Sequence, residues 1–314
     1  MAASGEARSI TAPHMRSRST RRRPEPLLGD LTFPEGPRWH DGRLYVSDFY
    51  DHRVLALAPD AAAEVVCEVP GQPSGLGFAP DGALLVVSMT DRRLLRREPD
   101  GTLREVADLS AHAPFHCNDM CVDAAGRAYV GNFGSDPARE PFAPTALLRV
   151  DPDGAVAVAA PDLLFPNGAV IAPGGTLLVA ETFAFRISAF DVDAEGDLSG
   201  RRIWAAFGAE PAHDLDAALA TRAIAPDGIC LDAEGALWVA DALGAGAHRV
   251  REGGEVLETV DAGAATVYAV ALGGADGRTL HLCCGPRLDG PDPATVRHGA
   301  IATVRVEVPG IAWA

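Results

Sequence analysis

The sequence predicts an all-β protein, a six-bladed β-propeller with a central channel. Three observations support this prediction. A glycine turn followed by alternating apolar residues occurs six times along the chain. The turns are roughly 40 to 60 residues apart, which is the repeat length of a four-stranded propeller blade. Helical periodicity is nearly absent outside residues 209–222, which we expect to form a helix or a loop.

The repeated unit has the pattern of a hairpin turn and the strand that follows it. An Asp-Gly pair between two apolar runs is a strong hairpin signal. Further strand-like runs lie between the copies, for example "HRVLALAP", "FRISAFDV" and "AIATVRVEV". Six repeats in about 290 residues therefore predict six blades of four strands. The copies, in chain order, are "HDGRLYVSD", "PDGALLVVS", "AAGRAYVGN", "PGGTLLVAE", "AEGALWVAD" and "ADGRTLHLC".

The N-terminal segment divides into a tail and a closing strand. An open sheet edge invites aggregation, so we expect residues 26–33, "PLLGDLTF", to add a strand to the last blade. The preceding "RSRSTRRRPE" lacks an apolar h-region, so residues 1–25 are expected to be a disordered basic tail and residues 26–314 the propeller. Without a secretory signal or an apolar run of about 18 residues, we expect a cytoplasmic protein that does not enter a membrane.

Composition excludes several classes of function. The net charge of −16 argues against a nucleic-acid partner. All 27 basic residues are arginine, which excludes a lysine Schiff base and a phosphate-loop lysine. The six cysteines form no C-x-x-C pair, so we expect buried free thiols rather than a zinc knuckle or redox motif. No G-x-S-x-G nucleophile motif occurs.

Polar residues recur at one register of the repeat. They lie eight residues before the turn glycine, or seven in the first copy. The apolar strand that follows should be the innermost strand of each blade. Equivalent positions in successive blades then form a ring at the mouth of the channel. The set is Glu35, Ser74, Asn118, Asn167, Asp227 and Ala269.

This ring predicts a metal site. Glu35, Asn118, Asn167 and Asp227 offer carboxylate and amide oxygens around one point. Hard oxygen ligands suit Ca²⁺, Mg²⁺ or Mn²⁺, and Zn²⁺ can also bind such a set. A single Asn or Asp of this kind is usually a turn residue that bonds its own backbone. Four of six at one register, including a glutamate, favour one shared divalent ion, with Ca²⁺ the first choice.

The ring motifs resemble a known family. They are similar to those of the regucalcin (senescence marker protein), gluconolactonase and bacterial lactonase family, which is related to diisopropylfluorophosphatase. The resemblance covers about residues 28 to 310 and implies a divalent ion bound by Glu35, Asn167 and Asp227. It makes Asn118 a fourth ligand or a substrate contact, and Asp227 the general base or nucleophile. The matching pieces are "EGPRWHDGRLYVSD", "PSGLGFAPDGALLV", "NDMCVDAAGRAYVG", "PNGAVIAPGGTLLVAET" and "PDGICLDAEGALWVAD".

One position departs from the family pattern. Sugar-lactone hydrolases of the family often carry an arginine two residues before the Asn-Asp pair, where this chain has His116. We expect His116 to face the substrate, the alternative being a packed histidine, and Asp119 to brace the loop. Three acidic residues that end inner strands are expected to be structural anchors rather than catalysts. These are Asp48, Glu181 and Asp241.

The function that follows is metal-dependent hydrolysis of a small-molecule lactone or ester by a monomer or small homo-oligomer. Asp227 would activate water or attack directly, with the ion polarising the carbonyl. Phe115, Phe165 and Phe183 predict a partly apolar mouth that accepts a more hydrophobic substrate than a sugar lactone. Two alternatives remain at this point. The same ion and Asp227 can support phosphotriester hydrolysis, or the propeller can be a calcium-binding protein without enzymatic activity.

Overall fold

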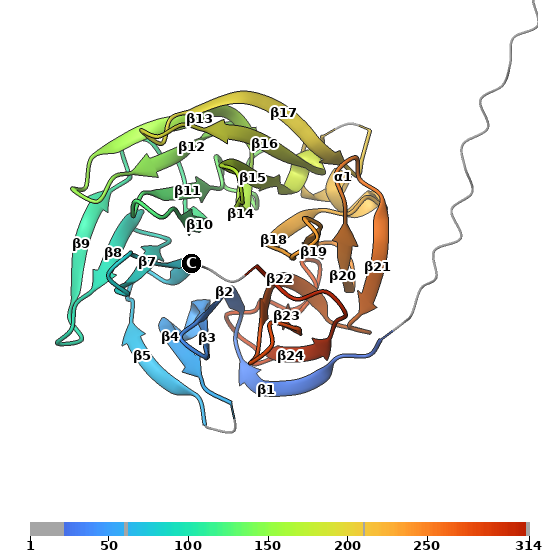
Figure 1. Ribbon diagram of the computed structural model, residues 1–314. Coiled ribbons are helices and arrows are strands. Elements are labelled where there is room, and N and C mark those ends of the chain that lie inside the picture. The colour runs from blue at the N-terminus through green and yellow to red at the C-terminus, as the bar shows by residue number, and fades with distance from the viewer. Residues whose placement is uncertain (1–21, 60–61, 210, 312–314) are drawn as a thin grey trace, which may run out of the picture.

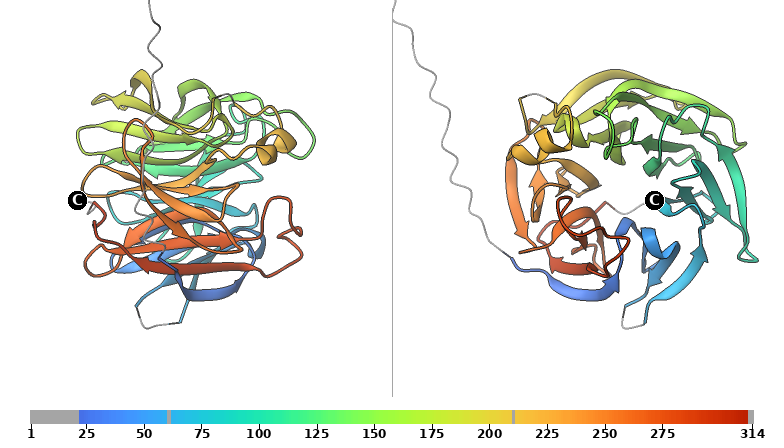
Figure 2. Two further views of the ribbon diagram at one scale, coloured as in Figure 1. Left: turned by 90° about the vertical axis from the view of Figure 1, so that its right-hand side faces the viewer. Right: turned by 180° about the vertical axis from the view of Figure 1, so that it is seen from behind.

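The computed structural model describes residues 22–59, 62–209 and 211–311. These residues form six four-stranded antiparallel sheets arranged around a central axis (Figure 1). The predicted six-bladed β-propeller is therefore confirmed. Figure 2 shows a short cylinder whose turns and loops lie on its two faces. Residues 1–21, most of the predicted basic tail, lie outside the described residues.

Blades 1 to 5 run from the axis to the rim in chain order, whereas the outer strand of blade 6 is the first strand of the described chain. The innermost strands of blades 1 to 6 are β2 (Pro34–His40), β6 (Pro73–Phe78), β10 (Cys117–Val122), β14 (Pro166–Ala172), β18 (Pro226–Leu231) and β22 (Thr266–Gly273). The second strands are β3 (Arg43–Asp48), β7 (Leu84–Ser88), β11 (Ala128–Asn132), β15 (Thr176–Glu181), β19 (Leu237–Asp241) and β23 (Thr279–Gly285).

The third and fourth strands complete the blades at the rim. The third strands are β4 (Arg53–Leu57), β8 (Arg93–Arg97), β12 (Pro144–Val150), β16 (Arg186–Val192), β20 (Gly246–Val250) and β24 (Gly299–Arg305). The outer strands are β5 (Glu64–Glu68), β9 (Leu103–Asp108), β13 (Val156–Leu164), β17 (Leu198–Ala206), β21 (Val256–Asp261) and, in blade 6, β1 (Glu25–Leu31).

The core lies between neighbouring blades. The inner strand β10 is buried along its whole length, whereas most residues of the outer strand β17 are exposed. Leu178 of β15, Leu237 of β19 and Val250 of β20 belong to one buried cluster between blades 4 and 5. Each fully buried side chain of this size stabilises the fold by roughly 1.5 to 3 kcal/mol. The inner and second strands are consequently rigid supports for residues at the channel.

The hairpin turn at Asp41-Gly42 forms where the sequence predicts it. Both residues have positive φ, 48° and 75°, and His40 pairs with Arg43 across the turn. Positive φ at both central positions defines a type I′ turn, whose twist matches that of the flanking strands. The turn therefore returns the chain from the innermost strand of blade 1 to its second strand.

The predicted closure of the ring is also confirmed. Strand β1 pairs with β24, with Glu25 opposite Thr303 and Leu31 opposite Gly299. Before β1, Arg22 forms an isolated parallel bridge with Val260 of β21. The last blade thus combines the first and the last strand of the described chain.

Helical structure is scarce in the described residues. The helix α1 (Leu215–Ala220) lies within the segment for which the sequence predicts a helix or a loop, and Asp214 caps it by accepting the Ala217 N–H at 2.8 Å. The short 3₁₀ turns η1 (Phe49–Asp51) and η2 (Thr182–Ala184) follow second strands. Among the described residues, no helix is both long enough and apolar enough to cross a bilayer. All six cysteines are free thiols, and five of them are buried.

Candidate metal centre

The four predicted ligands all lie at the start of an innermost strand. In each case the pairing with the second strand is interrupted there by a register shift. Such a bulge leaves residues unpaired and re-aims their side chains. The interruptions fall between Glu35 and Arg38, Cys117 and Met120, Pro166 and Ala169, and Pro226 and Ile229. Ser74 lies in an equivalent shift.

Neighbouring positions of the ring touch one another. A Cβ atom added to Gly168 would lie only 2.5 Å from Asp227 O, and one added to Gly228 only 2.5 Å from the Cβ of Ala269. The glycine after the ring residue therefore allows the inner strands of blades 4, 5 and 6 to approach closely. In blades 1 and 2 the Ser47 hydroxyl donates a 2.6 Å hydrogen bond to Ser74 O.

Two carboxyl groups of the ring are buried, and neither forms an ion pair with an arginine in the part of the chain that the structure describes. Glu35 is 8% exposed and Asp227 is 6% exposed. Burial, followed by the charge of Asp119, raises the pKa of Glu35 to about 8, although the Gly36 N–H donates to its carboxylate at 2.9 Å. Burial raises the pKa of Asp227 as well, and the charges of Glu35 and Asp119 add to the rise. These groups are close enough to repel each other, which is the electrostatic setting that a bound cation relieves.

The amide side chains complete an oxygen-rich set. Asn167 Nδ2 donates to Thr182 Oγ1 at 3.1 Å, and the nearby Asn167 side chain opposes the rise of the Asp227 pKa. Asp227 Oδ1 and Asn118 Nδ2 are buried and have no hydrogen-bond partner among the described residues. Rotation of an amide exchanges its oxygen and nitrogen, so Asn118 can present either to the centre. An unpartnered carboxylate oxygen, with the Asn167 amide close to its carboxylate, fits a hard divalent ion.

The predicted anchors hold the loops that lead into the inner strands. Each carboxylate ends a second strand and accepts backbone N–H groups from the segment just before a ring residue. Glu181 is fully buried, and its two oxygens also accept hydrogen bonds from Nε and Nη2 of Arg186, each at 2.8 Å. The backbone donors are Thr32 and Phe33 for Asp48, Leu164 for Glu181, and Ala225 for Asp241.

His116 packs among aromatic rings and stays partly exposed. Its ring stacks on Phe115 with centroids 4.0 Å apart, and its centroid is 5.8 Å from that of Phe133. Burial lowers the pKa of His116, so its imidazole is neutral at neutral pH. This placement is compatible with both expected roles, a substrate contact and a packed histidine.

The aromatic residues near His116 form a continuous cluster at the same face as the ring. Phe133 stacks on Phe165 at 4.5 Å, Phe165 meets Phe183 edge-on at 4.8 Å, and Phe142 stacks on Phe183 at 3.8 Å. Our sequence reasoning missed Phe133 and Phe142. Phe133 directly follows a second strand, as Phe49 does in blade 1, and that register is a signal that could have found it. Phe142 lies in a longer loop and gives no such signal.

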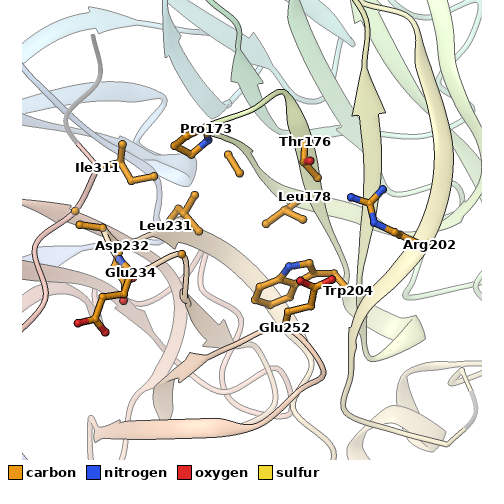
Figure 3. Close-up of a pocket in the computed structure, with 14 residues that line it drawn as sticks. Pro173, Thr176, Leu178, Arg202, Trp204, Leu231, Asp232, Glu234, Glu252 and Ile311 are labelled. Carbon is orange, nitrogen blue, oxygen red and sulfur yellow. The ribbon is translucent and has the colours of Figure 1, made fainter.

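A separate hollow of about 630 Å³ opens at the other end of the inner strands (Figure 3). Asp227 stands near the start of β18, whereas Leu231, which lines the hollow, ends it. Trp204 and Arg202 line the opposite wall. The Asp232 carboxylate there already accepts two backbone N–H groups and the Arg249 guanidinium, so it serves the turn. We therefore place the candidate site in the ring.

The chain is similar to known proteins in sequence and in fold. A family model described as the SMP-30/Gluconolactonase/LRE-like region matches residues 33–284. Pentonolactonase XacC of Haloferax volcanii is 29% identical over 252 residues, which cover 79% of this chain and 80% of that protein. The 6-deoxy-6-sulfogluconolactonase of Pseudomonas putida is 25% identical over 285 residues, which cover 88% of this chain and 92% of that protein.

Solved structures show the same fold. A regucalcin from Agrobacterium tumefaciens, described as a calcium-binding protein, superposes with a TM-score of 0.73 at 20% identity and covers 92% of this chain and 96% of its own. The match of the family model extends from the residue before β2 almost to the end of β23, and so includes every predicted ligand. The chain belongs to the SMP-30/gluconolactonase/LRE-like family.

Proposed function

We propose that this protein is a metal-dependent hydrolase that opens the ring of a lactone. The observation that carries the proposal is the ring itself, two buried carboxyl groups and two amides at equivalent bulges, with one carboxylate oxygen unpartnered among the described residues. The Haloferax and Pseudomonas relatives are named as lactonases, which supports the reaction class. The Agrobacterium relative is described as calcium-binding, which supports Ca²⁺ as the ion.

Glu35, Asn118, Asn167 and Asp227 would hold the ion. A divalent ion at this position supplies a Lewis acid that polarises the lactone carbonyl and stabilises the oxyanion. The burial of these four side chains would strengthen this stabilisation, because electrostatic interactions are stronger where water is excluded. Thr182 fixes the orientation of the Asn167 amide through the 3.1 Å hydrogen bond.

Asp227 would act as the general base. Its carboxylate takes a proton from water while the water oxygen bonds to the carbonyl carbon. The bond between that carbon and the ring oxygen then breaks, and the proton passes from Asp227 to the departing alkoxide. In an alternative mechanism the Asp227 carboxylate attacks the carbonyl carbon directly and forms an acyl-enzyme, and water hydrolyses this intermediate in a second step.

Substrate selection would fall to the residues around the mouth. A neutral His116 can donate one hydrogen bond to a substrate oxygen but lacks the fork and the fixed charge of an arginine. The aromatic cluster of Phe115, Phe133 and Phe165 borders it. We therefore propose that simple apolar lactones are better substrates than anionic or densely hydroxylated sugar lactones.

The test is a panel of γ- and δ-lactones and one aryl phosphotriester, each assayed with Ca²⁺, Mg²⁺, Mn²⁺ and Zn²⁺. We expect lactone hydrolysis that Asp227→Asn lowers by about 10² to 10⁴-fold or more, with an unchanged circular dichroism spectrum. Asp191→Asn is the matched control, because Asp191 is exposed on β16 and pairs with Arg202. Hydrolysis of the phosphotriester alone would assign the alternative reaction. If the wild type hydrolyses nothing with any ion, the protein is not this hydrolase.

A further inference from the structure

We propose that Arg38 is a positioning residue that holds Asn118 in the ion-binding ring by bracing Asp119 from another blade. Arg38 lies on β2 of blade 1, three residues after Glu35. Its Nη2 is 2.8 Å from Asp119 Oδ1 and also donates to Met120 O. Both partners belong to β10 of blade 3, so the guanidinium bridges two blades that are not neighbours. This inference rests on the proposed ion site.

Glycines bring the three blades close enough for this bridge. A Cβ atom added to Gly36 would lie 2.6 Å from Ser74 O, and one added to Gly75 would lie 2.6 Å from Met120 N. The inner strands of blades 1, 2 and 3 therefore approach each other with no side chain between them at these positions. One arginine side chain can then reach past blade 2.

The bridge acts where the sheet itself gives little support. Asn118 and Asp119 lie inside the register shift between Cys117 and Met120, so ladder pairing does not fix their conformation. The Met120 N–H donates to Asp119 Oδ1 at 2.8 Å, and Arg38 binds the same oxygen. Asn118 Nδ2 has no partner of its own in the described chain. The direction of the Asn118 side chain therefore depends on how Arg38 holds the next residue.

The charges of the site balance only with both Arg38 and an ion. The Arg38 side chain is 18% exposed and that of Asp119 is 6% exposed. Glu35, Asp119 and Asp227 bring three negative charges, and Arg38 with a divalent ion brings three positive ones. Buried charge is tolerated when it is paired in this way. The charge of Arg38 acts on Glu35 as well, in the direction that favours its ionised form.

A purely electrostatic role and a positioning role of Arg38 predict opposite effects of its removal on Ca²⁺ affinity. If Arg38 acted only as a nearby positive charge, Arg38→Met would strengthen binding of Ca²⁺ by removing repulsion. If it positions Asn118, the same variant weakens binding. Loss of a residue that orients metal ligands typically costs about 10- to 100-fold in metal affinity. We expect a loss in that range, and partial recovery in Arg38→Lys, which retains one charged donor.

The experiment is calorimetric titration of CaCl₂ into metal-stripped protein, with Arg104→Met as control because Arg104 is exposed and pairs with Glu98. A double-mutant cycle with Asn118→Ala gives the sharper result, because Arg38 and Asn118 show no direct hydrogen bond. We expect Asn118→Ala to weaken Ca²⁺ binding in the wild type and to have little further effect in Arg38→Met. If Arg38→Met alone does not fold, the double variant Arg38→Met with Asp119→Asn takes its place, because it removes both charges of the ion pair together. In this background too, Asn118→Ala should have little further effect on Ca²⁺ binding.

The outcomes separate the two proposals. Wild-type protein that binds none of the tested ions would overturn the proposed function and the role of Arg38 with it. Ca²⁺ binding by the wild type that Arg38→Met leaves equal or tighter would overturn only the positioning role. Additive effects of Arg38→Met and Asn118→Ala would also overturn it, because independent sites add.

Discussion

Replacement of Glu35 by glutamine should stabilise the ion-free protein at alkaline pH. In the unfolded chain the Glu35 carboxyl has its ordinary pKa of 4.5, whereas in the folded protein burial and Asp119 raise it to about 8. Between these values the folded state binds a proton that the unfolded state has lost. The contribution of Glu35 to stability is therefore fully present below pH 4.5 and is lost as pH rises through about 8.

The magnitude follows from the two pKa values. The interval from 4.5 to about 8, at about 1.4 kcal/mol for each pH unit, corresponds to on the order of 5 kcal/mol. Glutamine carries no proton to lose and can still accept the Gly36 N–H bond that Glu35 Oε2 accepts at 2.9 Å. The variant and the wild type should thus be similarly stable near pH 4.5 and diverge by several kcal/mol near pH 8.5.

Urea unfolding in EDTA, followed by tryptophan fluorescence from pH 4.5 to 9, measures the divergence. Contributions of titrating groups outside the ring are shared and cancel in the difference between the two proteins, whereas Asp227 loses the repulsion of Glu35 in the variant. Addition of Ca²⁺ should narrow the difference, because binding to the native wild type stabilises it by about 2.7 kcal/mol at 100 times the Kd. Parallel pH curves for the two proteins in EDTA would show that Glu35 is not held in a buried, repulsive site, and the electrostatic reasoning would fail.

Three further predictions concern residues around the ring. Glu181→Gln should lower the free energy of unfolding by about 3 kcal/mol, measured in urea, because it breaks a buried ion pair with Arg186; an unchanged midpoint would contradict this. Thr182→Val should weaken Ca²⁺ binding several-fold by calorimetry, since one hydrogen bond to Asn167 is worth about 1 kcal/mol, whereas Thr182→Ser should not. His116→Ala should change the ratio of kcat/KM between apolar and hydroxylated lactones more than it changes kcat/KM for the preferred lactone. An unaltered ratio would show that His116 is only a packed residue.

The sequence predicts the fold because the evidence for it is local. Each turn glycine lies only a few residues from the alternating strand that follows it, and the spacing of the repeats gives the number of blades. The ring is predictable for the same reason, since Asn167 and Asp227 occupy the same place in their repeats. The closing strand follows from the need to cover an edge.

The contacts between different blades could not be predicted in this way. Arg38 and Asp119 are 81 residues apart, and no repeat register relates a residue of blade 1 to one of blade 3. The raised pKa of Glu35 depends on burial and on Asp119, which only the assembled ring provides. Phe142 reaches the aromatic cluster from a long loop whose path the strand pattern does not define.

The pairing of β1 with β24 sets the order in which the chain can finish folding. Blades 1 to 5 each consist of consecutive strands, so each can form as it leaves the ribosome. Blade 6 has to wait until Gly299 has been synthesised and can meet Leu31. Contacts between such distant residues form slowly. During translation the first strand is therefore an unpaired edge, and docking of this strand should be the last step, the one at which crowded nascent chains are most exposed to pairing with each other.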